Sequence, residues 1–279
     1  MSTFHSTRSS DEAFTSKQAI RKGIADDGGL FVTDALGETK IDISDLAGKS
    51  YQQIALTVLS VLLDDYTEEE LSQCIAEAYG SQWSDERITP VKPLGNDFIM
   101  ELFNGPTCAF KDVALQILPR LMARTTPADG DCDEKIMIVT ATSGDTGKAA
   151  LAGFADAQGT GITVFYPQGK VSRVQELQMT TQQGSNVNVC AVDGNFDDAQ
   201  STVKRIYPKQ EQKSENRSER RKAERKQRQS EKFIQAEIDS INYANALQAL
   251  ESLDFVLEAD QLVFKRGMSV FVSTTTNFI

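Results

Sequence analysis

The alternation of short apolar segments with amphipathic segments over residues 96–206 most constrains how this chain can fold. Segments rich in isoleucine and valine predict strands, and the three- to four-residue apolar spacing between them predicts helices. Strands joined by helices are typical of a parallel sheet with right-handed crossovers. We expect strands at 98–103, 136–142, 162–166 and 187–192, and helices at 111–124, 147–158, 171–183 and 196–206.

Residues 1–95 have a mostly helical pattern instead. Ser10-Asp11-Glu12 is typical of a cap for a helix over 13–24, which the turn at 26–29 would end before a short strand over 30–32. An apolar-rich helix is expected at 51–63, and the segment 65–70 is typical of a capping box that opens a further helix through Tyr79. The sequence therefore predicts a helical domain over 1–95 and a βαβ domain over 96–206.

The third block, residues 207–279, begins with a charged run over 208–232 that holds ten lysines and arginines and five glutamates. Pro208 and Ala223 are its only apolar residues, so the run cannot bury a face and predicts a solvated helix or linker. Basic clusters can contact nucleic-acid phosphates, but the interleaved glutamates, the missing aromatics and the acidic remainder favour a solvated run. A helix over 234–259 and a lone strand over 269–273 are expected to follow.

The composition of 279 residues with a net charge of −11 is typical of a globular protein with a sizeable core. No apolar run reaches the roughly 18 residues of a membrane helix, and the polar N-terminus does not resemble a secretion signal. We therefore expect a cytoplasmic protein without a membrane partner.

Histidine and cysteine usage narrows the chemistry. His5 is the single histidine, which argues against multi-histidine metal sites and Ser-His-Asp devices elsewhere in the chain. The cysteines are scattered and form no CxxC pair, so we expect reduced thiols and no metal site. Cys108 is interpreted as a buried small residue rather than a reactive thiol. The four cysteines are Cys74, Cys108, Cys132 and Cys190.

The segment 103–112 places Lys111 at the start of an amphipathic helix, behind a Gly-Pro turn. A lysine at a helix start is usually a solvated side chain. Here Ala109 and Phe110 precede it and an apolar helical face follows, which favours partial burial. Burial lowers the pKa of a lysine and suits it to Schiff-base chemistry and proton transfer.

The segment 142–147 lies between an apolar strand and a helix. Its glycines permit close backbone approach, and the free amides of a helix N-terminus favour an anion there. A Walker A loop is excluded because Thr142 stands where its first glycine is needed and Ala149 follows Lys148. An ordinary strand-to-helix turn is the alternative. A reactive amine near an anion-binding loop is what an enzyme that uses pyridoxal phosphate needs.

These motifs and several others resemble those of the threonine synthase family, within the tryptophan-synthase-like (fold type II) pyridoxal phosphate enzymes. The resemblance implies an α/β architecture that is incomplete here, with a helical N-terminal region, a parallel βαβ domain and an irregular helical C-terminal segment. The matching segments are 6–8, 26–32, 101–107, 109–112, 142–147, 169–172, 175–179 and 194–200.

The resemblance implies a reaction in which O-phosphohomoserine and water give L-threonine and phosphate. Lys111 would form the Schiff base with pyridoxal 5′-phosphate and shuttle protons. The glycine-hydroxyl loop would hold the carboxylate of this small-molecule substrate. Its residues are Thr142, Ser143, Gly144, Asp145, Thr146 and Gly147.

The end of the chain departs from the family. Where the family's cofactor-phosphate loop reads Pro-Thr-Gly-Asn-Phe-Gly, Asn277 keeps the cofactor-binding position, but Thr276 and Ile279 replace both glycines. β-Branched residues resist positive φ and close backbone approach, so weaker phosphate anchoring is expected. Our hypothesis is a truncated, decayed or frame-disrupted family member after about Ile206. The alternative function is then a catalytically inactive remnant that binds at most an anion or a partner.

Overall fold

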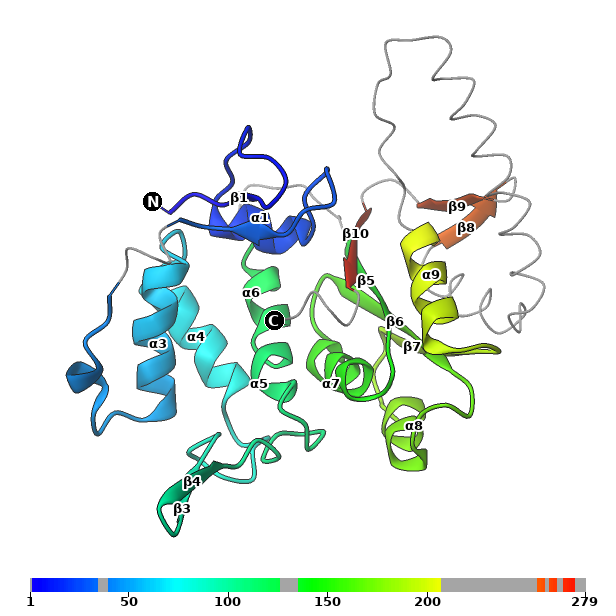
Figure 1. Ribbon diagram of the computed structural model, residues 1–279. Helices are drawn as coiled ribbons and strands as arrows, with labels where there is room; N and C mark the ends of the chain where they lie inside the picture. Colours follow the sequence, from blue (N-terminus) through cyan, green and yellow to red (C-terminus); the bar gives the residue numbers. More distant parts are fainter. Residues whose placement is uncertain are drawn as a thin grey trace.

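A four-stranded parallel sheet forms the centre of the computed structural model, which describes residues 2–34, 40–125, 135–206, 255–258, 261–264 and 268–273 (Figure 1). The strand order is β10-β5-β6-β7, with every neighbouring pair parallel. The predicted parallel sheet is thus confirmed, and the strand expected over 269–273 joins it by pairing with β5. The strands are β5 (Lys135–Ala141), β6 (Thr160–Pro167), β7 (Val187–Val192) and β10 (Met268–Ser273).

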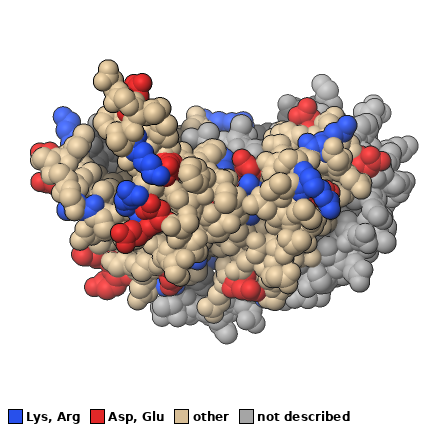
Figure 2. Space-filling model, turned by 90° about the horizontal axis from the view of Figure 1, so that it is seen from below, with Lys and Arg blue, Asp and Glu red and all other residues tan. Residues whose placement is uncertain are grey.

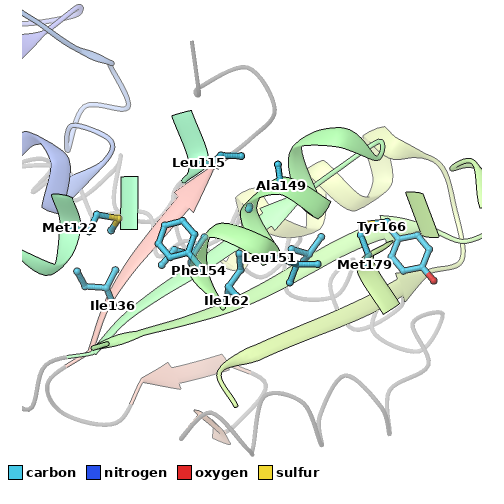
Figure 3. Packing of buried hydrophobic residues seen from close by; sticks show 12 residues of the cluster. Leu115, Met122, Ile136, Ala149, Leu151, Phe154, Ile162, Tyr166 and Met179 are labelled. Carbon is cyan, nitrogen blue, oxygen red and sulfur yellow. The ribbon is translucent and has the colours of Figure 1, made fainter. Parts of the chain in front are cut away.

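Three helices connect or follow these strands, as the sequence predicts: α7 (Asp145–Phe154), α8 (Arg173–Thr180) and α9 (Phe196–Ile206). Figure 3 shows one core, in which apolar side chains of β5 and β6 pack against those of α7 and α8. Phe154, Leu151, Ile162 and Met179 are fully buried there. Burial of such side chains supplies the main force that holds the helices on the sheet.

The N-terminal part packs around a second core, in which Leu71, Cys74 and Ala78 are fully buried. Its predicted helices are confirmed, although the first is shorter than expected. It begins after a capping box of Thr15 and Gln18, not at Ser10-Asp11-Glu12. The elements are β1 (His5–Ser6), α1 (Ser16–Lys22), β2 (Phe31–Val32), the 3-10 helix η1 (Ile43–Leu46), α3 (Tyr51–Leu62) and α4 (Glu68–Ala78).

The predicted parallel strand over 98–103 is wrong. Strands β3 (Val91–Leu94) and β4 (Asp97–Met100) form a separate antiparallel hairpin. Gly95, with φ +61°, lies in the two-residue turn, and so short a connection can join only antiparallel strands. All eight strand residues are exposed. The hairpin lies at the lower end of the molecule in Figure 1, and Figure 2, which shows the molecule from below, shows that much of this face is uncharged.

The single helix expected over 111–124 is divided into α5 (Asp112–Leu115) and α6 (Leu118–Ala123). Pro119 has no N–H to donate to the carbonyl of Leu115, which interrupts the helical hydrogen bonding. That carbonyl lies against Gly153 of α7, where a Cβ would overlap it. The absence of a side chain at Gly153 therefore lets α5 pack closely on α7.

The C-terminal expectations are only partly covered by the structure. Residues 255–258 of the expected helix 234–259 are strand β8 (Phe255–Glu258), which pairs antiparallel with β9 (Gln261–Phe264). The remainder of that helix and the charged run 208–232 lie outside the described residues. Within the described ranges, no helix is both long and apolar enough to cross a membrane.

Asp65 joins α1 to the start of α4. Its carboxylate accepts hydrogen bonds from the Ser16 hydroxyl and from the Lys17 backbone amide, the latter at 2.9 Å. Lys17 also places its amine 2.8 Å from both carboxylate oxygens of Glu70 and 4.7 Å from the centre of the Tyr66 ring. These contacts set the position of α1 on the second core.

Substitution Asp65→Asn is predicted to lower the free energy of unfolding at pH 7 by about 1 to 2 kcal/mol, measured by urea unfolding. Burial alone would raise the pKa of Asp65, but the hydrogen bonds from Ser16 and Lys17 outweigh it and lower that pKa. The stabilisation is therefore present above the unfolded-state pKa of about 3.9 and is lost as the pH falls through the folded-state pKa. The exposed control Asp45→Asn should change little; equal losses in both variants would contradict this assignment.

Candidate functional site

Lys111 lies immediately before α5, at the position that the sequence predicts. Its amine is 4.7 Å from the centre of the Phe110 ring, a cation–π contact. The side chain is partly buried, and within the described ranges the amine has no hydrogen-bond or ion-pair partner. A lysine amine held near the surface without a counter-ion is available to react with a carbonyl compound.

The buried carboxylate of Asp112 fixes the loop that precedes Lys111. It accepts hydrogen bonds from Thr107 Oγ1 at 2.7 Å, from the Thr107 amide at 2.9 Å and from the Ala109 amide at 3.4 Å. Gly105 leaves room for it, because a Cβ there would lie 2.6 Å from Asp112 Oδ2. A buried carboxylate is costly without such donors, so the loop must keep this conformation while Asp112 is inside.

Cys108, at the tip of this loop, is exposed rather than buried, which corrects the expectation from the sequence. Its φ of +57° lies in the left-handed region. The hydrogen bond from its amide to the Gly105 carbonyl, at 3.1 Å, belongs to the same tight turn. Asp112 accepts from Thr107 and Ala109, on either side of Cys108, and the Cys108 side chain is left exposed. Cys74 and Cys190 are buried.

The 142–147 loop connects β5 to α7 and is built around the Thr142 hydroxyl. Thr142 Oγ1 accepts from the Gly144 amide at 3.0 Å and from the Gly147 amide at 2.8 Å. Gly144 has φ +143°, which side-chain-bearing residues rarely adopt. Within the described ranges, the amides of Ser143, Asp145 and Thr146 have no hydrogen-bond partner. They are donors at a helix N-terminus, where an anion is favoured.

Asp145, exposed at the start of α7, is held by two partners. Gln175 Nε2 donates to Asp145 Oδ1 at 2.9 Å, and the amine of Lys148 lies 3.0 Å from the same oxygen. Burial alone would raise the pKa of Asp145, but the hydrogen bonds from Gln175 and Lys148 lower it. Lys148 is itself buried and compensates the carboxylate charge next to the open amides.

Helix α8 contacts both motifs. Gln175 reaches Asp145 in one loop, and Gln178 Nε2 donates to the Thr107 carbonyl in the other at 3.2 Å. The structure thus brings the predicted Lys111 and 142–147 motifs to the same helix. Sequence reasoning did not assign Gln175 or Gln178 to the site, although the motif 175–179 was the signal that could have found them.

The predicted cofactor-phosphate residues lie outside the described part of the chain: Thr276, Asn277 and Ile279. Strand β10, which precedes them, ends at Ser273 beside Thr140 of β5. Because the two strands are parallel, β10 ends at the sheet edge from which the 142–147 loop leaves. No group of three or more potential metal ligands occurs among the described residues.

Comparison with known proteins matches two family models. Residues 3–79 match the threonine synthase N terminus, and residues 87–217 match the pyridoxal-phosphate dependent enzymes. A solved structure of threonine synthase from Brucella melitensis with PLP bound has a TM-score of 0.65 and 37% identity, covering 74% of this chain and 44% of that one. The yeast threonine synthase structure has a TM-score of 0.63 and 34% identity, covering 72% and 42%.

Curated relatives give the same result. Threonine synthase from Pseudomonas aeruginosa is 36% identical over 208 residues, which is 74% of this chain and 44% of that protein. The Schizosaccharomyces pombe enzyme is 33% identical over 99% of this chain and 52% of its own length. The chain therefore spans about half the length of these relatives, and similarity to the second continues beyond Ile206.

Substitution Gly105→Ala is predicted to destabilise the chain by about 2 to 3 kcal/mol, because the added methyl group displaces the Asp112 carboxylate from its donors. The control is Gly95→Ala, where no atom lies within 4 Å of the added Cβ and only φ +61° opposes the change. That control should lose about 1 kcal/mol. Denaturant unfolding measures both variants, and an equal or smaller loss for Gly105→Ala would refute the role given to Asp112.

Proposed function

This chain belongs to the threonine synthase family of pyridoxal-phosphate-dependent enzymes, and on that premise we propose that it binds pyridoxal 5′-phosphate through Lys111 and converts O-phosphohomoserine and water to L-threonine and phosphate. We also propose that the protein is cytoplasmic and that its substrate is a small molecule. Its main support is one observation: a lysine amine and three loop amides that have no partner among the described residues belong to segments that a single helix connects.

The described residues fit the reactive end of the cofactor. The Lys111 amine meets no competing carboxylate within the described ranges, so it is available to the cofactor's aldehyde carbon. The cofactor, when bound, supplies an electron sink for proton removal next to the amino group. Lys111 would then lie next to the reacting carbon, because it is the lysine that holds the cofactor. It is therefore the base that can take a proton and return it.

The substrate carboxylate fits the 142–147 loop. The amides of Ser143, Asp145 and Thr146 can donate to its oxygens, and the partial positive charge at the N-terminus of α7 adds to the attraction. Asp145 would repel an approaching anion if it were uncompensated, but Lys148 and Gln175 hold its carboxylate. In this proposal Thr142 and Gly147 shape the loop, while the open amides bind.

A catalytically inactive chain is the second candidate, and one observation favours it. Thr276 and Ile279 replace the glycines of the family's cofactor-phosphate loop. In that case the open amides would still bind an anion, without turnover.

The proposal predicts that reduction by borohydride with pyridoxal 5′-phosphate attaches one phosphopyridoxyl group to Lys111, identified by peptide mass spectrometry. Lys111→Ala should lose this label and phosphate release from O-phosphohomoserine, because no other amine replaces Lys111. Lys49→Ala, at an exposed lysine outside the matching segments, is the matched control and should keep both. Labelling without turnover would support the inactive chain, and absence of the Lys111 label in the unaltered chain would refute cofactor binding.

A further inference from the structure

The matching segments 169–172 and 175–179 have no role in holding the cofactor or the substrate in the proposed function. We propose that Gln175 and Gln178, three residues apart on α8, are positioning residues that hold the Lys111 loop and the 142–147 loop in a fixed relative position. The catalytic meaning of this inference rests on the proposed function, whereas its structural content does not.

The motif first fixes α8 itself. Gly169, with φ +67°, turns the chain after β6, and Ser172 caps the helix by accepting from the Gln175 amide. The Gln175 side chain returns the contact, since its Oε1 accepts from the Ser172 amide at 3.2 Å. Met179 is fully buried in the first core and anchors the other end of the helix. Helix α8 is therefore held at both ends, by its cap and by Met179.

Gln175 reaches the 142–147 loop with the other half of its carboxamide. While Oε1 completes the helix cap, Nε2 donates to Asp145 Oδ1 at 2.9 Å. The carboxamide also lies directly against Gly144, where a Cβ would be 2.5 Å from Nε2. Gln175 therefore fixes both the Asp145 carboxylate and the backbone next to the open amides.

Gln178 reaches the other loop. Its Nε2 donates to the Thr107 carbonyl at 3.2 Å, while its Oε1 is buried and has no partner in the described part of the chain. Thr107 is the residue that donates twice to Asp112, next to Lys111. Gln178 thus secures the outer side of a loop whose inner side Asp112 secures.

The packing of α5 on α7 cannot replace this link. Leu115 and Gly153 bring the two helices together within their length. The Lys111 loop, however, precedes α5, and the 142–147 loop precedes α7, so this packing does not contact either loop directly. A loop held only at its helix end can change its distance from the opposite loop. The two glutamine contacts remove that freedom, because they start from neighbouring turns of one helix.

Hydrogen–deuterium exchange of the full chain tests the inference without cofactor. The reporters are the amides of Thr107, Cys108 and Ala109 in one loop, and of Gly144, Gly147 and Lys148 in the other. Gln178→Met should raise exchange of the first set about fivefold, the effect of one lost hydrogen bond, and Gln175→Met should do the same to the second. Gln183→Met, the same change at an exposed glutamine whose side chain donates to the Thr181 carbonyl and contacts neither loop, should alter neither set.

Gln178→Glu separates hydrogen bonding from packing. It keeps the side-chain length but places a carboxylate oxygen against the Thr107 carbonyl, so the first set should exchange faster than in Gln178→Met. Unchanged exchange in both methionine variants, or equal changes in Gln183→Met, would overturn the inference.

Borohydride labelling of Lys111 is the second readout: Gln178→Met should slow it several-fold and Gln175→Met should not. Absence of labelling in the unaltered chain would refute the proposed function, and the exchange result would still decide the role of the glutamines.

Discussion

The buried carboxylate of Asp112 is the constraint on which the site depends. A carboxylate enters the interior only if donors replace the water that it loses, and here they come from Thr107 and Ala109. This requirement folds the 105–110 segment over the start of α5, turns Cys108 outward and leaves Lys111 at the surface beside Phe110. The conformation of the lysine loop thus follows from satisfying one buried charge.

The 142–147 loop is likewise ordered because its hydrogen-bonding groups need partners, here neutral amides rather than a buried carboxylate. The Thr142 hydroxyl satisfies two amides of the turn, so the amides left open are those of Ser143, Asp145 and Thr146. Some donors of the loop thus build its conformation, while the other three have no partner among the described residues. Helix α8 relates this loop to the lysine loop through two carboxamides, and Met179 ties that helix to the sheet.

The sequence predicted the elements whose signals are local. Apolar patterns predicted β5, β6, β7 and α3, and a capping box predicted α4, because both signals act within a few residues. It failed where a distant partner decides. The apolar run over 98–103 suits either sheet type, and only its pairing with β3 settles the matter. The burial of Asp112 and the reach of Gln178 to Thr107, 71 residues away, likewise depend on the assembled fold. The domain division at residues 95 and 206 stays a prediction.

The central claim is that the fold by itself presents Lys111 as a free amine while it protects the other lysine of the site. Reductive methylation by formaldehyde and cyanoborohydride, followed residue by residue with mass spectrometry, measures this directly. The account predicts that Lys111 reacts at a rate close to that of the exposed Lys170, and that Lys148, buried and paired with Asp145, reacts far more slowly. A Lys111 that is as protected as Lys148 would contradict it.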